Sequence, residues 1–155
     1  MNQPELELAM IYRLQVRGPA LARDGSPANP RTQFWEMLEA TLEGPEIRAS
    51  SPMPGIDWFT PGTAGYGRPH VRMPFVTDDG ALVLLEYRGI VHATAAFDRA
   101  VARDTATDWN DQYMRMAMTF ETTSERYAWL MQSLFIARGR LRGAKELEYE
   151  VYRLS

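Results

Sequence analysis

The stretch VRMPFVTDDGALVLLEYRG, residues 71–89, indicates the fold most directly. Two apolar runs flank Thr-Asp-Asp-Gly, and an Asp-Gly pair favours a hairpin turn. The turn is either a type I′ turn at Asp79 and Gly80 or a longer one with Gly80 in the left-handed conformation. The stretch therefore predicts two antiparallel strands, and both turn aspartates are assigned no catalytic role. Charged residues such as Arg72 and Glu86 alternate with apolar ones, so the pattern leaves open which strand face lies inside.

Further strands are expected before and after this hairpin. Residues 6–16 are mixed in period, but Ile11, Tyr12, Leu14 and Val16 suit a strand better than a helix. Period-two alternation of apolar and other side chains predicts a strand at 112–120. The last two strands are expected at 129–142 and 147–154, and the second of these alternates up to Val151. Residues 17–32 and 50–70 are rich in proline and glycine and predict loops, with short strand fragments at 56–59. A short helix is expected within residues 93–111.

Residues 34–43, FWEMLEATLE, give a conflicting local signal. Phe34, Trp35, Leu38 and Leu42 have helical spacing, and the segment is rich in good helix formers. Taken by itself, the segment predicts a helix that ends at the following Gly-Pro.

The pattern of many strands, turn signals and one short helix is typical of an all-β fold. We expect one domain, residues 1–155, built as an antiparallel β-barrel or sandwich, and a chain of this length provides roughly eight strands for a barrel. The interior of such a barrel is large enough for one small ligand.

Composition narrows the classes of function. The 155 residues contain no cysteine, which excludes disulfides, thiolate nucleophiles and thiolate metal sites. The net charge is −3, with acidic and basic residues interspersed, so neither a nucleic-acid surface nor a polybasic membrane anchor is predicted. Neither a signal peptide nor a bilayer-spanning apolar run is visible, and a cytoplasmic protein is expected.

Five motifs occur in a fixed order along the chain. They are LEGPEIRASSPMPGIDW (42–58), TDDGALVLLEYRG (77–89), YMRMAMTFET (113–122), RYAWLMQSLFIARG (126–139) and VYRL (151–154). In this order the chain resembles a bacterial and fungal family of small lipocalin-like β-barrels that is catalogued as a domain of unknown function, in the uncharacterised UPF/DUF class. The resemblance implies a single closed antiparallel, lipocalin-like β-barrel of roughly eight strands or more, with one short helix, around a hydrophobic cavity. It implies no common reaction. It also implies a strand at residues 34–43, where the family usually has glycines at the positions of Glu39 and Ala40.

Asp57 and Arg72 are the first candidate catalytic residues. Asp57 precedes Trp58 in an irregular stretch, and burial beside an aromatic ring would raise the pKa of its carboxyl group and make it a general base. The alternative is an aspartate that only stabilises a turn. Arg72 is a candidate anchor for a carboxylate or enolate oxygen, or else an exposed or structural ion-pair partner.

Tyr113, Arg115 and Glu121 complete the catalytic candidates. They share one strand face, where tyrosine and arginine would stabilise an oxyanion and glutamate would transfer a proton. Met114, Met116, Met118 and Phe120 occupy the opposite face, and only one of the two faces points into a barrel. If the methionine face is inside, Arg115 is outside.

Aromatic residues that are expected to contact a ligand are Trp58, Tyr87, His92 and Trp129. No metal site is predicted, because His70 and His92 lack the spacing of paired histidine ligands. No cofactor is predicted either.

Two main hypotheses follow. The first is a cofactor-independent acid/base enzyme, a lyase, isomerase or cyclase, acting on a small hydrophobic oxygenated compound of aromatic or polyketide-like character. The second is a binding or carrier barrel that holds a hydrophobic metabolite without chemistry. A third is a homo-oligomer that associates through strand edges and aromatic residues.

Overall fold

The computed structural model describes residues 3–26 and 31–155. Within them the chain forms ten strands, one α-helix and one 3₁₀-helix. In chain order these are β1 (Leu6–Arg17), β2 (Gln33–Gly44), β3 (Ile47–Ser50), β4 (Gly55–Pro61), β5 (Tyr66–Arg68), β6 (His70–Thr77), β7 (Leu82–His92), α1 (Ala95–Arg103), β8 (Tyr113–Glu121), η1 (Glu125–Met131), β9 (Leu134–Gly143) and β10 (Glu146–Leu154). The all-β prediction is confirmed.

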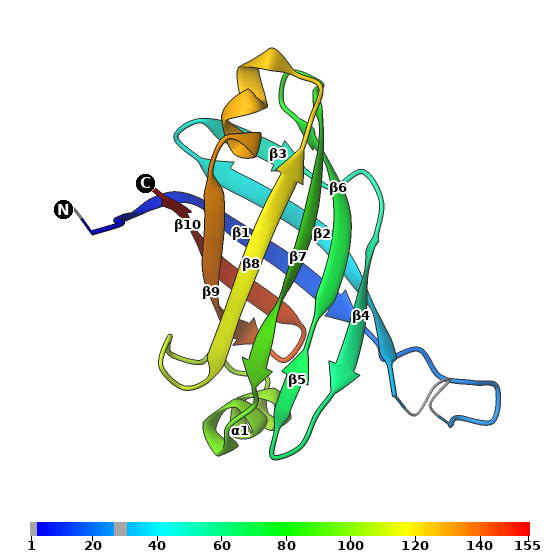
Figure 1. Ribbon diagram of the computed structural model, residues 1–155. Helices are drawn as coiled ribbons and strands as arrows, with labels where there is room; N and C mark the ends of the chain where they lie inside the picture. The colour runs from blue at the N-terminus through cyan, green and yellow to red at the C-terminus, as the bar shows by residue number, and fades with distance from the viewer. Residues whose placement is uncertain (1–2, 27–30) are drawn as a thin grey trace.

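All pairings between neighbouring strands are antiparallel, and they close the sheet into a barrel (Figure 1). β1 pairs with β10 on one side and with β2 on the other. β7 pairs with β8 on one side and with both β5 and β6 on the other. The predicted hairpin is therefore β6–β7, and of its turn residues only Gly80 has a positive φ, at 85°. This is the longer of the two predicted turns.

The register of the strands decides which faces are inside. Val71, Met73 and Phe75 of β6 are buried, and Leu85 and Tyr87 of β7 lie opposite Met73 and Val71. On β8 the buried side chains are Met114, Met116, Met118 and Phe120. The methionine face is therefore the inner one, which settles the alternative that the sequence left open.

Residues 34–43 belong to strand β2, so the local helix prediction is wrong and the family resemblance is confirmed. The register between β1 and β2 shifts between Arg13 and Gln15, and Glu39 takes a left-handed φ of 46°. This irregularity places the buried Met37 and Ala40 three residues apart, where a regular strand would place them two or four apart. Pairing with β1 and β4 satisfies the backbone and overrides helix propensity.

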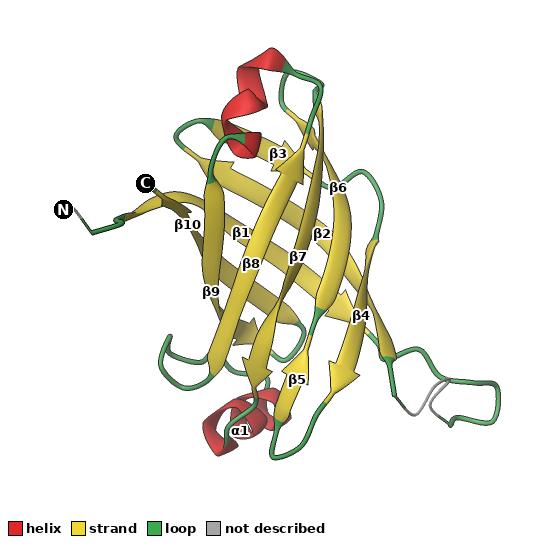
Figure 2. Cartoon of the chain, in the orientation of Figure 1, coloured by secondary structure: helices red, strands yellow, loops and turns green. Residues whose placement is uncertain are grey.

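The two helices close opposite ends of the barrel (Figure 2). The short helix predicted in 93–111 is α1, which begins at its N-cap Thr94. Trp129 was expected in a strand but belongs to η1, and β9 begins only at Leu134. Buried Tyr127 and Leu130 hold η1 on the barrel end, and the Tyr127 hydroxyl donates a 2.7 Å hydrogen bond to Asp79.

The loop predictions are partly confirmed. The predicted loop at 50–70 contains more strand than expected, namely β4 and β5. Residues 27–30 of the predicted loop 17–32 lie outside the described residues. None of the described helices is long and apolar enough to cross a membrane.

Candidate active site

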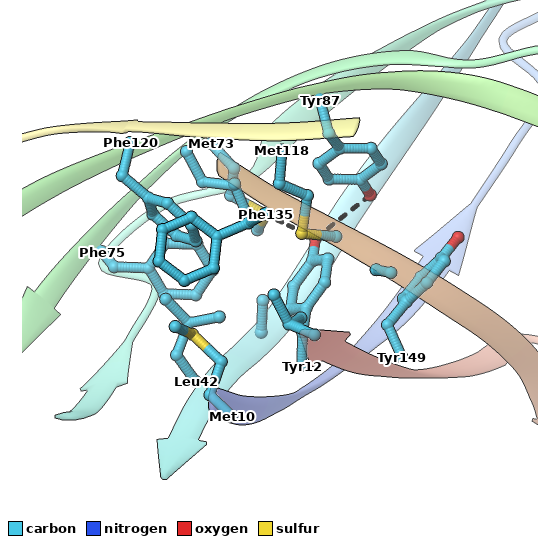
Figure 3. Packing of buried hydrophobic residues seen from close by; sticks show 14 of the residues in the cluster. Met10, Tyr12, Leu42, Met73, Phe75, Tyr87, Met118, Phe120, Phe135 and Tyr149 are labelled. Atoms are coloured by element: carbon cyan, nitrogen blue, oxygen red, sulfur yellow. Dashed lines mark hydrogen bonds between the residues drawn. The ribbon is translucent and has the colours of Figure 1, made fainter. Parts of the chain in front are cut away.

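The barrel interior is packed solidly toward η1 and ends in a layer of three tyrosines (Figure 3). Phe75, Phe120 and Phe135 fill the packed part, as the left side of Figure 3 shows. The Tyr12 ring stacks on Tyr149 with 5.5 Å between centroids and meets Tyr87 edge-on at 5.8 Å. These contacts form a rigid aromatic layer across the barrel.

Hydrogen bonds orient the buried hydroxyl groups of this layer. The Tyr12 hydroxyl lies 3.4 Å from the Met73 sulfur, to which it donates, and 3.3 Å from the Tyr87 hydroxyl. Burial is the main cause that raises the pKa of both Tyr87 and Tyr149 well above its usual value. Both phenols are therefore neutral hydrogen-bond donors at physiological pH.

Between the tyrosine layer and α1 lies a partly open cavity of about 320 Å³. Its lining is mostly apolar and aromatic. The lining residues are Val16, Trp35, Met37, Asp57, Phe59, Gly65, Pro69, Tyr87, Val91, Ala93, Phe97, Asp98, Val101, Met114, Leu141, Ala144, Leu147 and Tyr149. The size and the character of this lining are those of a small-ligand site.

Asp57 is the carboxylate that β4 directs into this cavity. It lies opposite Trp35 of β2 and Val71 of β6 in the strand register. The backbone N–H of His70 donates a 3.0 Å hydrogen bond to its Oδ1. Burial raises the pKa of the Asp57 carboxyl group to about 6, and the His70 hydrogen bond opposes this only in part. A carboxylate with this pKa is suited to accept and return a proton near neutral pH.

Tyr149 is a site residue that the sequence analysis missed. Among the described residues, no side chain or backbone group accepts or donates a hydrogen bond at its hydroxyl, although its ring is buried. Gly139 on β9 leaves room for the ring, since a Cβ there would come within 2.5 Å of it. The alternation of residues 147–151 already placed Tyr149 with Leu147 and Val151, and this shared face was the available signal.

The other predicted catalytic residues lie outside the barrel. The Arg72 side chain is 74% exposed and pairs with Glu86 at 3.0 Å. Tyr113 and Glu121 are exposed, and the Arg115 guanidinium lies 4.9 Å from the Tyr113 ring centroid. None of these four lines the cavity, because the register turns the methionine face of β8 inward. These four residues were expected to form one site with Asp57. In the structure they lie on the outer face, away from the cavity that Asp57 lines.

Of the four predicted ligand contacts, Tyr87 lines the cavity. Trp58 is 57% exposed and meets Phe34 edge-on. His92 stacks on Tyr66 with 4.0 Å between ring centroids. Trp129, which belongs to η1, packs on Phe135 at the other end of the barrel. Among the described residues, no three His, Asp or Glu side chains gather as a metal site requires.

Solved structures share this fold. The structure is similar to a protein of unknown function from Rhodopseudomonas palustris, with a TM-score of 0.83, 22% identity and coverage of 100% of this chain and 99% of that one. A β-barrel-like protein from Acinetobacter baumannii gives a TM-score of 0.77, 24% identity and coverage of 100% and 98%. A protein from Penicillium herquei, called an enzyme, gives 0.69, 18% identity and coverage of 100% and 97%. At these identities the likeness shows the fold alone.

Sequence comparison identifies the family. A UPF0311 protein of Clostridium acetobutylicum is 28% identical over 106 residues, which are 68% of this chain and 67% of that protein. The family model described as protein of unknown function (DUF3237) matches residues 4–154. Since this match covers nearly the whole chain, the protein belongs to the DUF3237 family of β-barrels.

Proposed function

We propose that the protein is an acid/base enzyme that works without a cofactor, as a lyase, isomerase or cyclase. Its substrate is a small hydrophobic oxygenated compound of aromatic or polyketide-like character, held in the cavity between the tyrosine layer and α1. The observation that carries the proposal is Asp57, a half-buried carboxylate whose pKa is raised to about 6 inside an apolar, aromatic cavity. The Penicillium herquei protein of the same fold, called an enzyme, is consistent with this proposal.

In the proposed chemistry Asp57 removes a proton from a carbon next to a carbonyl group. The electron pair of the broken C–H bond moves onto the carbonyl oxygen, which becomes an enolate. The Tyr149 hydroxyl donates a hydrogen bond to that oxygen, and burial keeps this phenol protonated. Return of the proton to another atom, or loss of a leaving group, completes an isomerisation or an elimination.

A carrier function is the second candidate. The observation that favours it is that four of the five predicted catalytic residues lie on the outer face, namely Arg72, Tyr113, Arg115 and Glu121. Inside the cavity, the polar groups near Asp57 are the hydroxyl groups of Tyr87 and Tyr149. A binding protein needs only an apolar cavity with a polar anchor.

Hydrogen exchange at carbon tests the enzyme proposal without knowledge of the natural substrate. The probe is 2-tetralone, a small bicyclic ketone with acidic α-protons, incubated with the protein in D₂O and followed by NMR. We expect the protein to accelerate α-deuteration, and Asp57→Asn to slow it by about a hundredfold or more. Tyr149→Phe should slow it by about tenfold to a hundredfold, because the oxyanion loses its donor.

The matched control is Glu121→Gln, which removes a carboxylate from the outer face and should leave exchange unchanged. Exchange that is equally fast with the wild type and with Asp57→Asn would contradict the enzyme proposal. Binding of 2-tetralone without any acceleration would favour the carrier.

A further inference from the structure

The charge balance of the cavity is one-sided. Among the described residues that line it there are two carboxylates, Asp57 inside and Asp98 on α1 at the mouth, and no lysine or arginine. Asp57 receives one hydrogen bond, at Oδ1, from a neutral backbone N–H. A buried ionised carboxylate is almost always paired with a cation. Within the described part of the chain, Asp57 has no cationic partner in the cavity.

Aromatic rings surround the same space. Trp35, Phe59 and Phe97 line its walls, and Tyr87 and Tyr149 form its floor. The faces of aromatic rings attract cations through their quadrupole, and this attraction grows when water is excluded. A carboxylate among several such rings is the chemistry that recognises an organic ammonium group.

We propose that the cavity binds a small aromatic molecule carrying a protonated amine, with its ammonium group on Asp57 and its rings among those of the cavity. The inference shares the cavity of the proposed function but does not depend on turnover. A volume of about 320 Å³ lies at the lower end of ligand pockets, so the aromatic part has about two fused rings. If Asp57 is also the base, such an amine is an inhibitor, because it occupies the proton-accepting carboxylate.

The other ionisable groups around Asp57 do not duplicate its role. Tyr87 on β7, Tyr149 on β10 and Tyr12 on β1 have pKa values raised by burial, and they stay neutral. Asp98 on α1 is exposed to solvent. On β6 the His70 ring lies 3.5 Å from Glu86, which is on the outer face with Arg72. The His92 ring on β7 stacks on Tyr66 and lies beside Gly65, which lines the cavity. A change in amine binding near pH 6 is therefore assigned to Asp57 when it is present in the wild type and absent from Asp57→Asn.

The test is calorimetric titration with three naphthalene probes that differ in charge: 1-naphthylmethylamine, 1-naphthalenemethanol and 1-naphthoate. At pH 7.5 we expect the wild type to bind the amine about tenfold more tightly than the alcohol, and the carboxylate most weakly. Asp57→Asn keeps the Oδ1 acceptor for His70 and should bind the amine and the alcohol equally. In the wild type the preference for the amine should disappear as the pH falls from 7.5 to 5.

Asp78→Asn, at the exposed hairpin turn, is the matched control and should keep the preference for the amine. Equal binding of amine and alcohol by the wild type at pH 7.5 would overturn the inference, and so would a preference that survives Asp57→Asn. A preference lost in Asp98→Asn and retained in Asp57→Asn would assign the ammonium to the mouth instead. If the protein prefers the amine but does not accelerate 2-tetralone exchange, the inference on amine binding stands and the enzyme proposal is rejected. If it accelerates exchange but does not prefer the amine, the enzyme proposal stands and this inference is rejected.

Discussion

At the scale of single residues, the ionised Asp57 lowers the free energy of unfolding, because its position in the cavity removes water from the carboxylate. Its folded-state pKa of about 6 exceeds the usual 3.8, so the folded protein binds this proton more tightly than the unfolded chain. Stability is therefore lost as the pH rises from about 4 to about 6, by up to about 3 kcal/mol. Such a cost is common for groups retained for activity or binding.

We therefore predict that Asp57→Asn raises the free energy of unfolding at pH 8, by up to about 3 kcal/mol, and changes it much less at pH 4. Urea unfolding at both pH values measures the difference between variant and wild type. Asp78→Asn, at an exposed position, should show little difference at either pH. A loss of stability in Asp57→Asn at pH 8 would mean that the ionised carboxylate stabilises the fold.

At the scale of the elements, the irregularity in β2 is a strained feature within a strand. Glu39 is exposed and has a φ of 46°, a conformation that is costly for a residue with a Cβ. Glycine adopts this conformation without that cost. The family resemblance implies glycines at the positions of Glu39 and Ala40. The left-handed φ at Glu39 is a physical reason for a glycine there.

We predict that Glu39→Gly stabilises the protein by about 0.5–1 kcal/mol, because the relief of strain exceeds the entropy that glycine adds to the unfolded chain. Glu43→Gly is the matched control on the same strand. Glu43 is also exposed, but its φ is not positive, so the change should destabilise by about 0.5–1 kcal/mol. Thermal unfolding of both variants checks the signs, and a fall in melting temperature for Glu39→Gly would refute the account of the bulge.

At the scale of the whole molecule, the two barrel ends have different tasks. The η1 end is filled, with Leu130 only 1% exposed, whereas the α1 end covers the cavity with Phe97 and Val101. A residue that fills a packed end contributes to stability, and one that lines a cavity contributes to binding.

Truncation at each end tests this division. We predict that Leu130→Ala lowers the free energy of unfolding by about 2–5 kcal/mol and leaves the affinity for 1-naphthalenemethanol unchanged. Phe97→Ala should cost only about 1–2 kcal/mol, because Phe97 is half-buried beside an existing cavity, and should weaken naphthyl binding. Urea unfolding and calorimetry measure both quantities, and equal stability losses would show that α1 is part of the packed core.

The sequence alone determined the β-barrel class, the β6–β7 hairpin, α1 and most strands. The evidence for them was the alternation of side chains, the turn residues and the order of the motifs. They were also enough for two cavity residues, Asp57 and Tyr87. Local patterns have a period of two and hold no information on which face is inner. Only the register showed that Arg72 and Tyr113 lie on the outer face. The cytoplasmic location and the oligomeric state stay predictions.

Only the tertiary structure decided how the cavity is composed. Asp57, Tyr87 and Tyr149 come from β4, β7 and β10, and closure of the barrel brings them to one space. The raised pKa of Asp57 has the same origin, because desolvation depends on what surrounds a group in space and not on its neighbours in the chain. Residue types and strand periodicity are local properties that sequence determines, whereas the burial of a charge is a property of the closed barrel.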